Sequence, residues 1–176
     1  MTIFETLDEI GTSKDLLFLV IGGHAVNAYG FSRFTKDLDI LINAKQRSEW
    51  VAALEQRGFK IEYDGRTFLQ MTSPPESAWP LDLMLVNEET FKRLNSETKI
   101  FEMAGTQMRV PSLWSLFALK FHVLKQEVPG RGFKDLLDVL ELAKCNAVDV
   151  RSDKMRELCE QFGNKKIYER LIAFGE

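Results

Sequence analysis

The spacing of hydrophobic positions changes along this chain of 176 residues. Through the first two thirds, short apolar runs rich in branched side chains alternate with polar or glycine-containing turns, a pattern typical of strands in an α/β protein. Beyond Pro111 the apolar positions recur at helical spacing. This order predicts an α/β core over residues 1–110, followed by a C-terminal helical region over residues 111–176 that packs on the core.

The same pattern predicts the individual elements. Short turns at Asp64-Gly65 and at Ala104-Gly105-Thr106 join neighbouring apolar runs, which predicts two hairpins. The expected strands cover residues 16–21, 37–42, 59–63, 66–71, 80–86, 100–103 and 107–110. The expected helices cover residues 24–29, 46–57, 112–125, 134–144, 151–162 and 166–174.

Carboxylates interrupt two of the apolar runs. Asp37 and Asp39 belong to run 37–42, and residues two apart on a strand point to one face. Asp82 lies in run 80–86, on the face opposite its leucines. Burying unpaired carboxylates costs on the order of several kcal/mol, and like charges disfavour one another unless a cation lies between them. Oxygen ligands favour Mg²⁺ or Mn²⁺ over zinc, so the three aspartates are candidate metal ligands.

These acidic positions also have alternatives. Asp37 would instead cap its strand and form an ion pair with Arg33 or Lys36. Glu62 and Asp64 compete with Asp82 for the third ligand position, although they lie at a turn that suits exposure to solvent.

Two glycines lie between the first apolar run and the aspartates. Gly22 and Gly23 follow run 16–21 directly and precede a short segment of helical composition that ends at Gly30. A strand, a glycine turn and a helix N-terminus favour anion binding, because backbone N–H groups point outward where no Cβ blocks approach. No Gly-Lys-Ser/Thr follows, so this is not a P-loop. We interpret the pair as a phosphate-binding turn.

The succession of Gly22-Gly23, Asp37-X-Asp39 and Asp82 resembles the signature of the DNA polymerase β-like nucleotidyltransferases. Within that superfamily, the string GGHAVNAYGFSRFTKDLDILI is most similar to small bacterial members, namely the AbiEii group of type IV toxin–antitoxin proteins and the antibiotic nucleotidyltransferases. A second element also resembles the AbiEii pattern; it runs from Ser112 to Lys120 and continues with Arg131, Lys134, Asp135 and Asp138. The resemblance implies a nucleotidyltransferase fold, with a mixed sheet flanked by helices.

The resemblance also implies roles for the acidic residues and glycines. Asp37 and Asp39 would bind Mg²⁺ or Mn²⁺ under the triphosphate of an NTP co-substrate. Asp82 would bind a second metal ion and help to activate the acceptor's nucleophile. The amides of Gly22 and Gly23 would hold the β- and γ-phosphates.

Four cations complete the implied site. Lys120 and Lys134 would act in catalysis by contacting phosphate or the leaving pyrophosphate, and Arg33 and Arg131 would assist in binding the nucleotide. The structural alternatives are that Lys120 is a solvated helix residue, as most lysines are, and that Lys134 only flanks a first-turn acid, Asp135.

Composition narrows the functional classes. The chain is 45% hydrophobic, enough for a core, and no apolar run approaches the roughly 20 residues of a membrane span. Residues 1–90 hold 8 Lys and Arg against 14 Asp and Glu, and residues 91–176 hold 15 against 12, which is not a broad nucleic-acid footprint. We expect no membrane partner and a cytoplasmic location. Cys145 and Cys159 lack metal-type spacing and are expected to be reduced and buried.

Three functional hypotheses follow. The first is a metal-dependent enzyme that moves an NMP group from an NTP to a hydroxyl of an acceptor, whether a small molecule, a tRNA end or a protein, with a cognate antitoxin as a further partner. The second is an inactive relative that acts as a protein-binding regulatory partner, which would be expected to lack one acidic ligand. The third, a phosphohydrolase or kinase, lacks a P-loop or kinase-type motif.

Overall fold

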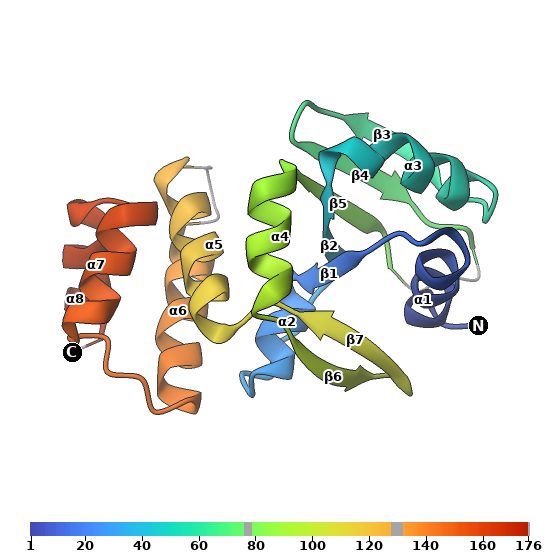
Figure 1. The fold of residues 1–176 in the computed structure, drawn as a ribbon. Coiled ribbons are helices and arrows are strands. Elements are labelled where there is room, and N and C mark those ends of the chain that lie inside the picture. Colours follow the sequence, from blue (N-terminus) through green and yellow to red (C-terminus); the bar gives the residue numbers. More distant parts are fainter. Residues whose placement is uncertain (76–78, 128–131, 176) are drawn as a thin grey trace. The chain divides into compact units, whose positions relative to one another are not determined.

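The computed structural model describes residues 1–75, 79–127 and 132–175 (Figure 1). By its internal contacts the chain divides into two units. The first comprises Met1–Ala25 and Arg33–Ser112, and the second comprises Val26–Ser32 and Leu113–Glu176. The second unit therefore includes the short segment Val26–Ser32 from early in the sequence. One contact within this unit is the hydrogen bond that Asn146 donates to the carbonyl of Tyr29 at 2.9 Å.

A five-stranded mixed sheet forms the centre of the first unit. Its spatial order is β1-β2-β5-β4-β3, and only the pair β2–β5 is parallel. The strands are β1 (Phe18–Ile21), β2 (Leu38–Asn43), β3 (Lys60–Asp64), β4 (Phe68–Thr72) and β5 (Leu81–Val86). The expected mixed sheet with flanking helices is confirmed, as is the hairpin formed by β3 and β4.

Helices and a second hairpin cover this sheet. The helices are α1 (Ile3–Lys14), α3 (Arg47–Glu55), which follows a 3-10 turn (Ala44–Gln46), and α4 (Glu88–Ser96). Trp50 of α3 is fully buried and packs edge-on against Phe18 of β1, with 5.4 Å between ring centroids. The hairpin of β6 (Lys99–Met103) and β7 (Thr106–Val110) was expected, and β7 contacts β1 and α1.

The sequence pattern did not predict α1 or α4. Both begin with a clear N-cap: the Thr2 hydroxyl accepts from the Glu5 amide, and the Glu5 carboxylate accepts from the Thr2 amide. The Asn87 side chain likewise accepts from the Thr90 amide. The Thr-X-X-Glu capping box was a sequence signal for α1 that hydrophobic periodicity alone does not use.

The second unit is helical. It contains α5 (Leu113–Lys125), α6 (Gly132–Cys145), α7 (Asp153–Phe162) and α8 (Lys165–Phe174), and α5 contacts the other three. All four expected C-terminal helices are present, with ends shifted by one or two residues. Cys159 is buried as expected, whereas Cys145 is exposed, which corrects that expectation. Within the described residues, every helix is too short or too polar to cross a lipid bilayer.

One short helix joins the two units. The helix α2 (Gly22–Ala28) begins at the glycine pair itself, two residues earlier than the pattern suggested. Its first four residues belong to the first unit and the remainder to the second.

Candidate active site

A row of polar residues crosses the sheet at the start of β2 and β5. Strand pairing aligns Ile21 of β1 with Asp39 of β2, Asp39 with Asp82 of β5, and Asp82 with Gln70 of β4. Directly paired residues on adjacent strands point to the same face of a sheet. The register therefore makes Asp39 and Asp82 immediate neighbours, although they are far apart in the sequence.

Asp82 is the most deeply buried of the predicted ligands. It is only 2% exposed, and the Gln70 amide donates to both carboxylate oxygens at 3.2 and 3.4 Å. A buried carboxylate requires such donors because desolvation strongly disfavours its charge. Sequence reasoning missed Gln70, whose signal was a lone amide between apolar residues in an expected strand.

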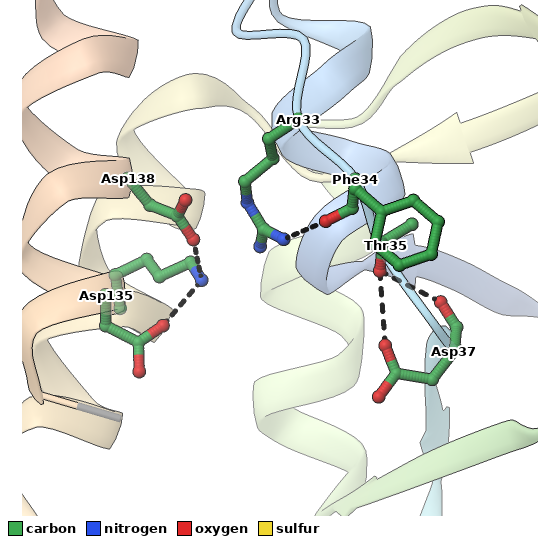
Figure 2. Close-up of polar contacts among 7 residues, drawn as sticks. Arg33, Phe34, Thr35, Asp37, Asp135 and Asp138 are labelled. Atoms are coloured by element: carbon green, nitrogen blue, oxygen red, sulfur yellow. Dashed lines mark hydrogen bonds and ion pairs between the residues drawn. The ribbon is translucent and has the colours of Figure 1, made fainter. Parts of the chain in front are cut away.

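Asp37 occupies a different position from the one expected. The strand β2 begins at Leu38, so Asp37 precedes the strand and is not its first residue. The Thr35 hydroxyl lies 3.2 Å from the Asp37 carboxylate and 3.2 Å from the Asp37 carbonyl, in position to donate to either (Figure 2). Thr35 is 8% exposed, and the sequence reasoning had not singled it out. The sequence feature that could have indicated Thr35 was its hydroxyl, two residues before Asp37.

Two of the three predicted aspartate ligands occupy paired positions on adjacent strands. Among the described residues, no three His, Cys, Asp or Glu side chains are grouped so that they would hold a metal ion. Asp39 and Asp82 are paired by the register, whereas the Asp37 carboxylate is turned to Thr35. Rotating Asp37 away would give up one hydrogen bond, worth about 1 kcal/mol. The described residues therefore do not form a three-carboxylate metal group, and metal binding by these aspartates stays a prediction.

The glycine pair lies directly against this acidic row. Gly22 has a φ of +61°, and a Cβ built there would overlap the carboxylate of Asp39. A Cβ at Gly23 would lie 2.5 Å from the Thr35 hydroxyl oxygen and 3.2 Å from a guanidinium nitrogen of Arg33. Both glycines are therefore needed for close approach of the chain to Asp39 and Thr35, whether or not a phosphate binds there.

Gly22→Ala should destabilise the fold and displace the Asp39 carboxylate, because it combines an unfavourable φ with a steric overlap. Gly105→Ala is the matched control: Gly105 has a φ of +83°, but no atom lies within 4 Å of its added Cβ. The control should lose about 1 kcal/mol in urea unfolding, and Gly22→Ala distinctly more. Equal losses would mean that the overlap with Asp39 is relieved at no cost.

Arg33 lies in the loop between the glycine pair and Asp37. Its guanidinium donates to the Phe34 carbonyl at 3.2 Å (Figure 2) and lies close to Gly23. This places a cation beside the predicted phosphate-binding turn. Its role in binding nucleotide stays a prediction.

His24 comes directly after the glycine pair, and its side chain lies among aromatic rings. Its imidazole packs edge-on against Trp79 and Phe4, at centroid distances of 4.8 and 5.4 Å. Its Nε2 atom is buried and has no hydrogen-bond partner among the described residues. Burial lowers the pKa of His24 below its usual 6.5; the Asp37 charge opposes this shift and the Arg33 charge adds to it.

This lowered pKa has a consequence for stability. Below about pH 6.5 the unfolded chain binds a proton at His24 more readily than the folded chain, so the folded state should lose stability as the pH falls from 7 to about 5.5. Urea unfolding at several pH values would measure the loss. His24→Phe should reduce it, whereas His122→Gln, at an exposed histidine of α5, should leave it unchanged. A loss of the same size in His24→Phe would contradict the assignment.

The second unit contains a buried ion-pair cluster. The Lys120 ammonium group of α5 lies 2.7 Å from Asp135 and 2.6 Å from Asp138, both on α6 (Figure 2). The three side chains are 12%, 9% and 1% exposed. Lys120 is therefore not a solvated surface lysine. The sequence interpretation assigned no role to Asp138. Its position one turn after Asp135, on the same amphipathic helix, was the sequence feature that could have indicated one.

The other residues predicted for the site, or as alternatives to it, are exposed to solvent or lie outside the described residues. Lys134 is exposed on α6, and Arg131 lies outside the described residues. Of the competing acids, Glu62 and Asp64 are both exposed, and Asp64 pairs with Arg47 at 2.6 Å. Their expected exposure to solvent is confirmed, although both lie within β3.

Several solved structures share this fold. The solution structure of the antibiotic-resistance factor ANT(2'')-Ia aligns with a TM-score of 0.68 and 18% identity, covering 97% of this chain and 93% of that one. The lincosamide antibiotic adenylyltransferase LnuA, solved with lincomycin bound, aligns with a TM-score of 0.56 and 16% identity over 80% of this chain and 95% of its own. A nucleotidyltransferase-like protein from Paracoccidioides brasiliensis aligns with a TM-score of 0.57 and 12% identity, over 97% and 90% of the two chains. At these identities the likeness establishes the fold.

The family is established by the sequence. No protein with a curated description matches the chain. The model of the family described as "Nucleotidyl transferase AbiEii toxin, Type IV TA system" matches residues 11–175, nearly the whole chain. The protein with the Asp39–Asp82 row therefore belongs to the AbiEii family of nucleotidyl transferases.

Proposed function

We propose that this protein transfers an NMP group from an NTP to an acceptor hydroxyl, with Mg²⁺ or Mn²⁺ as the cofactor. The observation that supports this most directly is the pairing of Asp39 with Asp82 on adjacent strands. This pair lies next to a glycine turn in which an added Cβ atom would clash with neighbouring side chains. Two neighbouring carboxylates bind a hard divalent cation in preference to a soft one.

The proposed reaction is an in-line displacement at the α-phosphorus. The acceptor oxygen forms a new bond to this phosphorus, the bond from phosphorus to the bridging oxygen breaks, and pyrophosphate leaves with the electron pair of that bond. The acceptor hydroxyl gives up its proton, for which the Asp82 carboxylate is the proposed base. Divalent cations, when bound, would offset charge on the phosphate oxygens.

The other predicted residues act on the triphosphate in this proposal. Asp37 would turn from Thr35 and hold the metal ion together with Asp39, and the amides of Gly22 and Gly23 would hold the β- and γ-phosphates. Arg33 contacts phosphate, and Lys120, Lys134 and Arg131 are the candidates that the sequence resemblance implies for contacting phosphate or the leaving pyrophosphate. Of these, Lys120 is already paired with two carboxylates, so the exposed Lys134 has the freer side chain for that task.

The acceptor is proposed as a class of hydroxyl compound, either a small molecule, an RNA end or a protein. One structural neighbour was solved with adenylyl-2''-tobramycin and another with lincomycin, which are small-molecule cases. The family description names a toxin of a type IV toxin–antitoxin system, which makes a cognate antitoxin protein a proposed partner.

Incubation with each of the four labelled NTPs, Mg²⁺ and cell extract would test the function. We expect one nucleotide to be incorporated into a product whose size class identifies the acceptor, with release of pyrophosphate. Release of inorganic phosphate without incorporation would indicate a phosphohydrolase instead. No incorporation from any nucleotide, with either metal, would favour the inactive regulatory partner.

A further inference from the structure

One aromatic ring of the first unit is unusually exposed. Phe34 is 80% accessible to solvent, more than Ile61, Tyr63 or Ile100 of the same unit. Single exposed apolar residues are common on proteins, so exposure alone does not indicate a function. The position of Phe34 and the anchoring of its neighbours distinguish it from the others.

The backbone on both sides of Phe34 is held in place. The guanidinium of Arg33 donates to the Phe34 carbonyl at 3.2 Å. On the other side, Thr35 is 8% exposed, and its hydroxyl bonds to Asp37. Figure 2 shows this arrangement, with the ring of Phe34 on the loop that leads directly into Asp37. The loop therefore presents the ring from an anchored backbone, which reduces the entropy lost in ordering the loop when a ligand stacks on the ring.

The chemistry around the ring is that of a nucleotide contact. Arg33 precedes Phe34 and the exposed Lys36 lies two residues after it, so this loop carries two cations as well as the aromatic ring. Sites for single-stranded nucleic acid combine cations for phosphate with aromatic rings on which bases stack. The loop reaches the proposed metal ligand Asp37 three residues later.

We infer that the ring of Phe34 is a ligand contact that stacks on a nucleobase at the active site. The inference rests on the proposed function and adds a base-binding residue to it. The base belongs either to the NTP or to the end of an RNA acceptor, and both present the same planar ring.

Binding measurements with Phe34→Ala, Phe34→Leu and Phe34→Trp would test the inference. Dissociation constants would be measured in Mg²⁺ for each NTP, for a short single-stranded RNA and for inorganic tripolyphosphate, which has no base. Phe34→Ala and Phe34→Leu should weaken binding of at least one base-containing ligand about tenfold, while Phe34→Trp should retain it. Binding of tripolyphosphate should be unchanged in all three variants.

Comparing NTP binding with RNA binding shows which ligand supplies the base that stacks on Phe34. Weaker NTP binding identifies the base of the nucleotide, and weaker RNA binding with unchanged NTP binding identifies the acceptor. Tyr63→Ala, at an exposed aromatic on the edge strand β3, is the matched control and should change neither. The inference is overturned if Phe34→Ala binds all ligands as the parent does, if Phe34→Leu retains full affinity, or if tripolyphosphate binding falls equally.

A different result of the same binding measurements would contradict the proposed function. A parent protein that binds neither NTP nor tripolyphosphate in Mg²⁺ would contradict nucleotide transfer itself. Binding of RNA that still depends on Phe34 would in that case leave the stacking contact intact.

Discussion

Asp39→Asn should lower the rate of nucleotide transfer by about a thousandfold or more while leaving the fold intact. The substitution keeps the shape of the side chain and removes the negative charge paired with Asp82 across β2 and β5. Transfer of a phosphoryl group depends mainly on positioning and charge stabilisation, so loss of a cation ligand acts directly on the rate. Initial rates with the incorporated NTP would measure the effect.

The stability of the same variant separates catalysis from folding. Removing one of two adjacent like charges should leave the melting temperature unchanged or slightly higher. In the parent, millimolar Mg²⁺ should raise the melting temperature, and Asp39→Asn should lose most of this response. Asp64→Asn, at an exposed carboxylate of the same unit, is the control and should keep both rate and metal response. A parent-like rate in Asp39→Asn would show that the metal site lies elsewhere.

Lys120→Ala is expected to have the largest effect on stability, with a loss of about 3–5 kcal/mol in urea unfolding. The substitution leaves Asp135 and Asp138 as neighbouring buried carboxylates without their shared cation. Breaking a buried ion pair by removing one partner is much more costly than replacing the whole group, because the remaining charge stays desolvated.

Two further variants complete this test. Combining Lys120→Met with Asp135→Asn and Asp138→Asn should recover most of the lost stability, since no buried charge then remains unpaired. Lys134→Ala, at an exposed lysine of α6, should change stability by no more than about 0.5 kcal/mol. A parent-like stability of Lys120→Ala would contradict the structural role. Activity of Lys134→Ala then tests a catalytic cation without a folding defect.

The local parts of the site were predictable from sequence. A strand of buried branched residues, a glycine pair and a second such strand show up as a short-range pattern, because backbone preferences and burial act within a few residues. Asp39 and Asp82 were recognisable because a charge within an apolar strand requires a partner. The four C-terminal helices followed from periodicity alone.

The partners of these residues were less predictable because they depend on strand register and helix packing. Nothing local to Asp82 indicates that Gln70 will donate to it, since that contact follows from the pairing of β4 with β5. The alternative that Lys120 is a solvated surface lysine was wrong, and its sequence neighbours could not show this because its two acidic partners lie on the next helix. Asp37 was placed on the strand because composition does not fix the residue at which strand pairing begins.

The parallel pairing of β2 with β5 also determines when the site exists during protein synthesis. Strands β1 and β2 are joined through α2 and the loop that follows it, whereas β5 can insert beside β2 only after α3, β3 and β4 have also been made. Contacts of such long sequence separation form late, because the intervening chain must first be closed into a loop. A nascent chain that has emerged from the ribosome only through Thr72 would contain Asp39 and the glycine pair but no Asp82. Translation through Val86 is therefore required before β5 can pair with β2 and the acidic row can be completed.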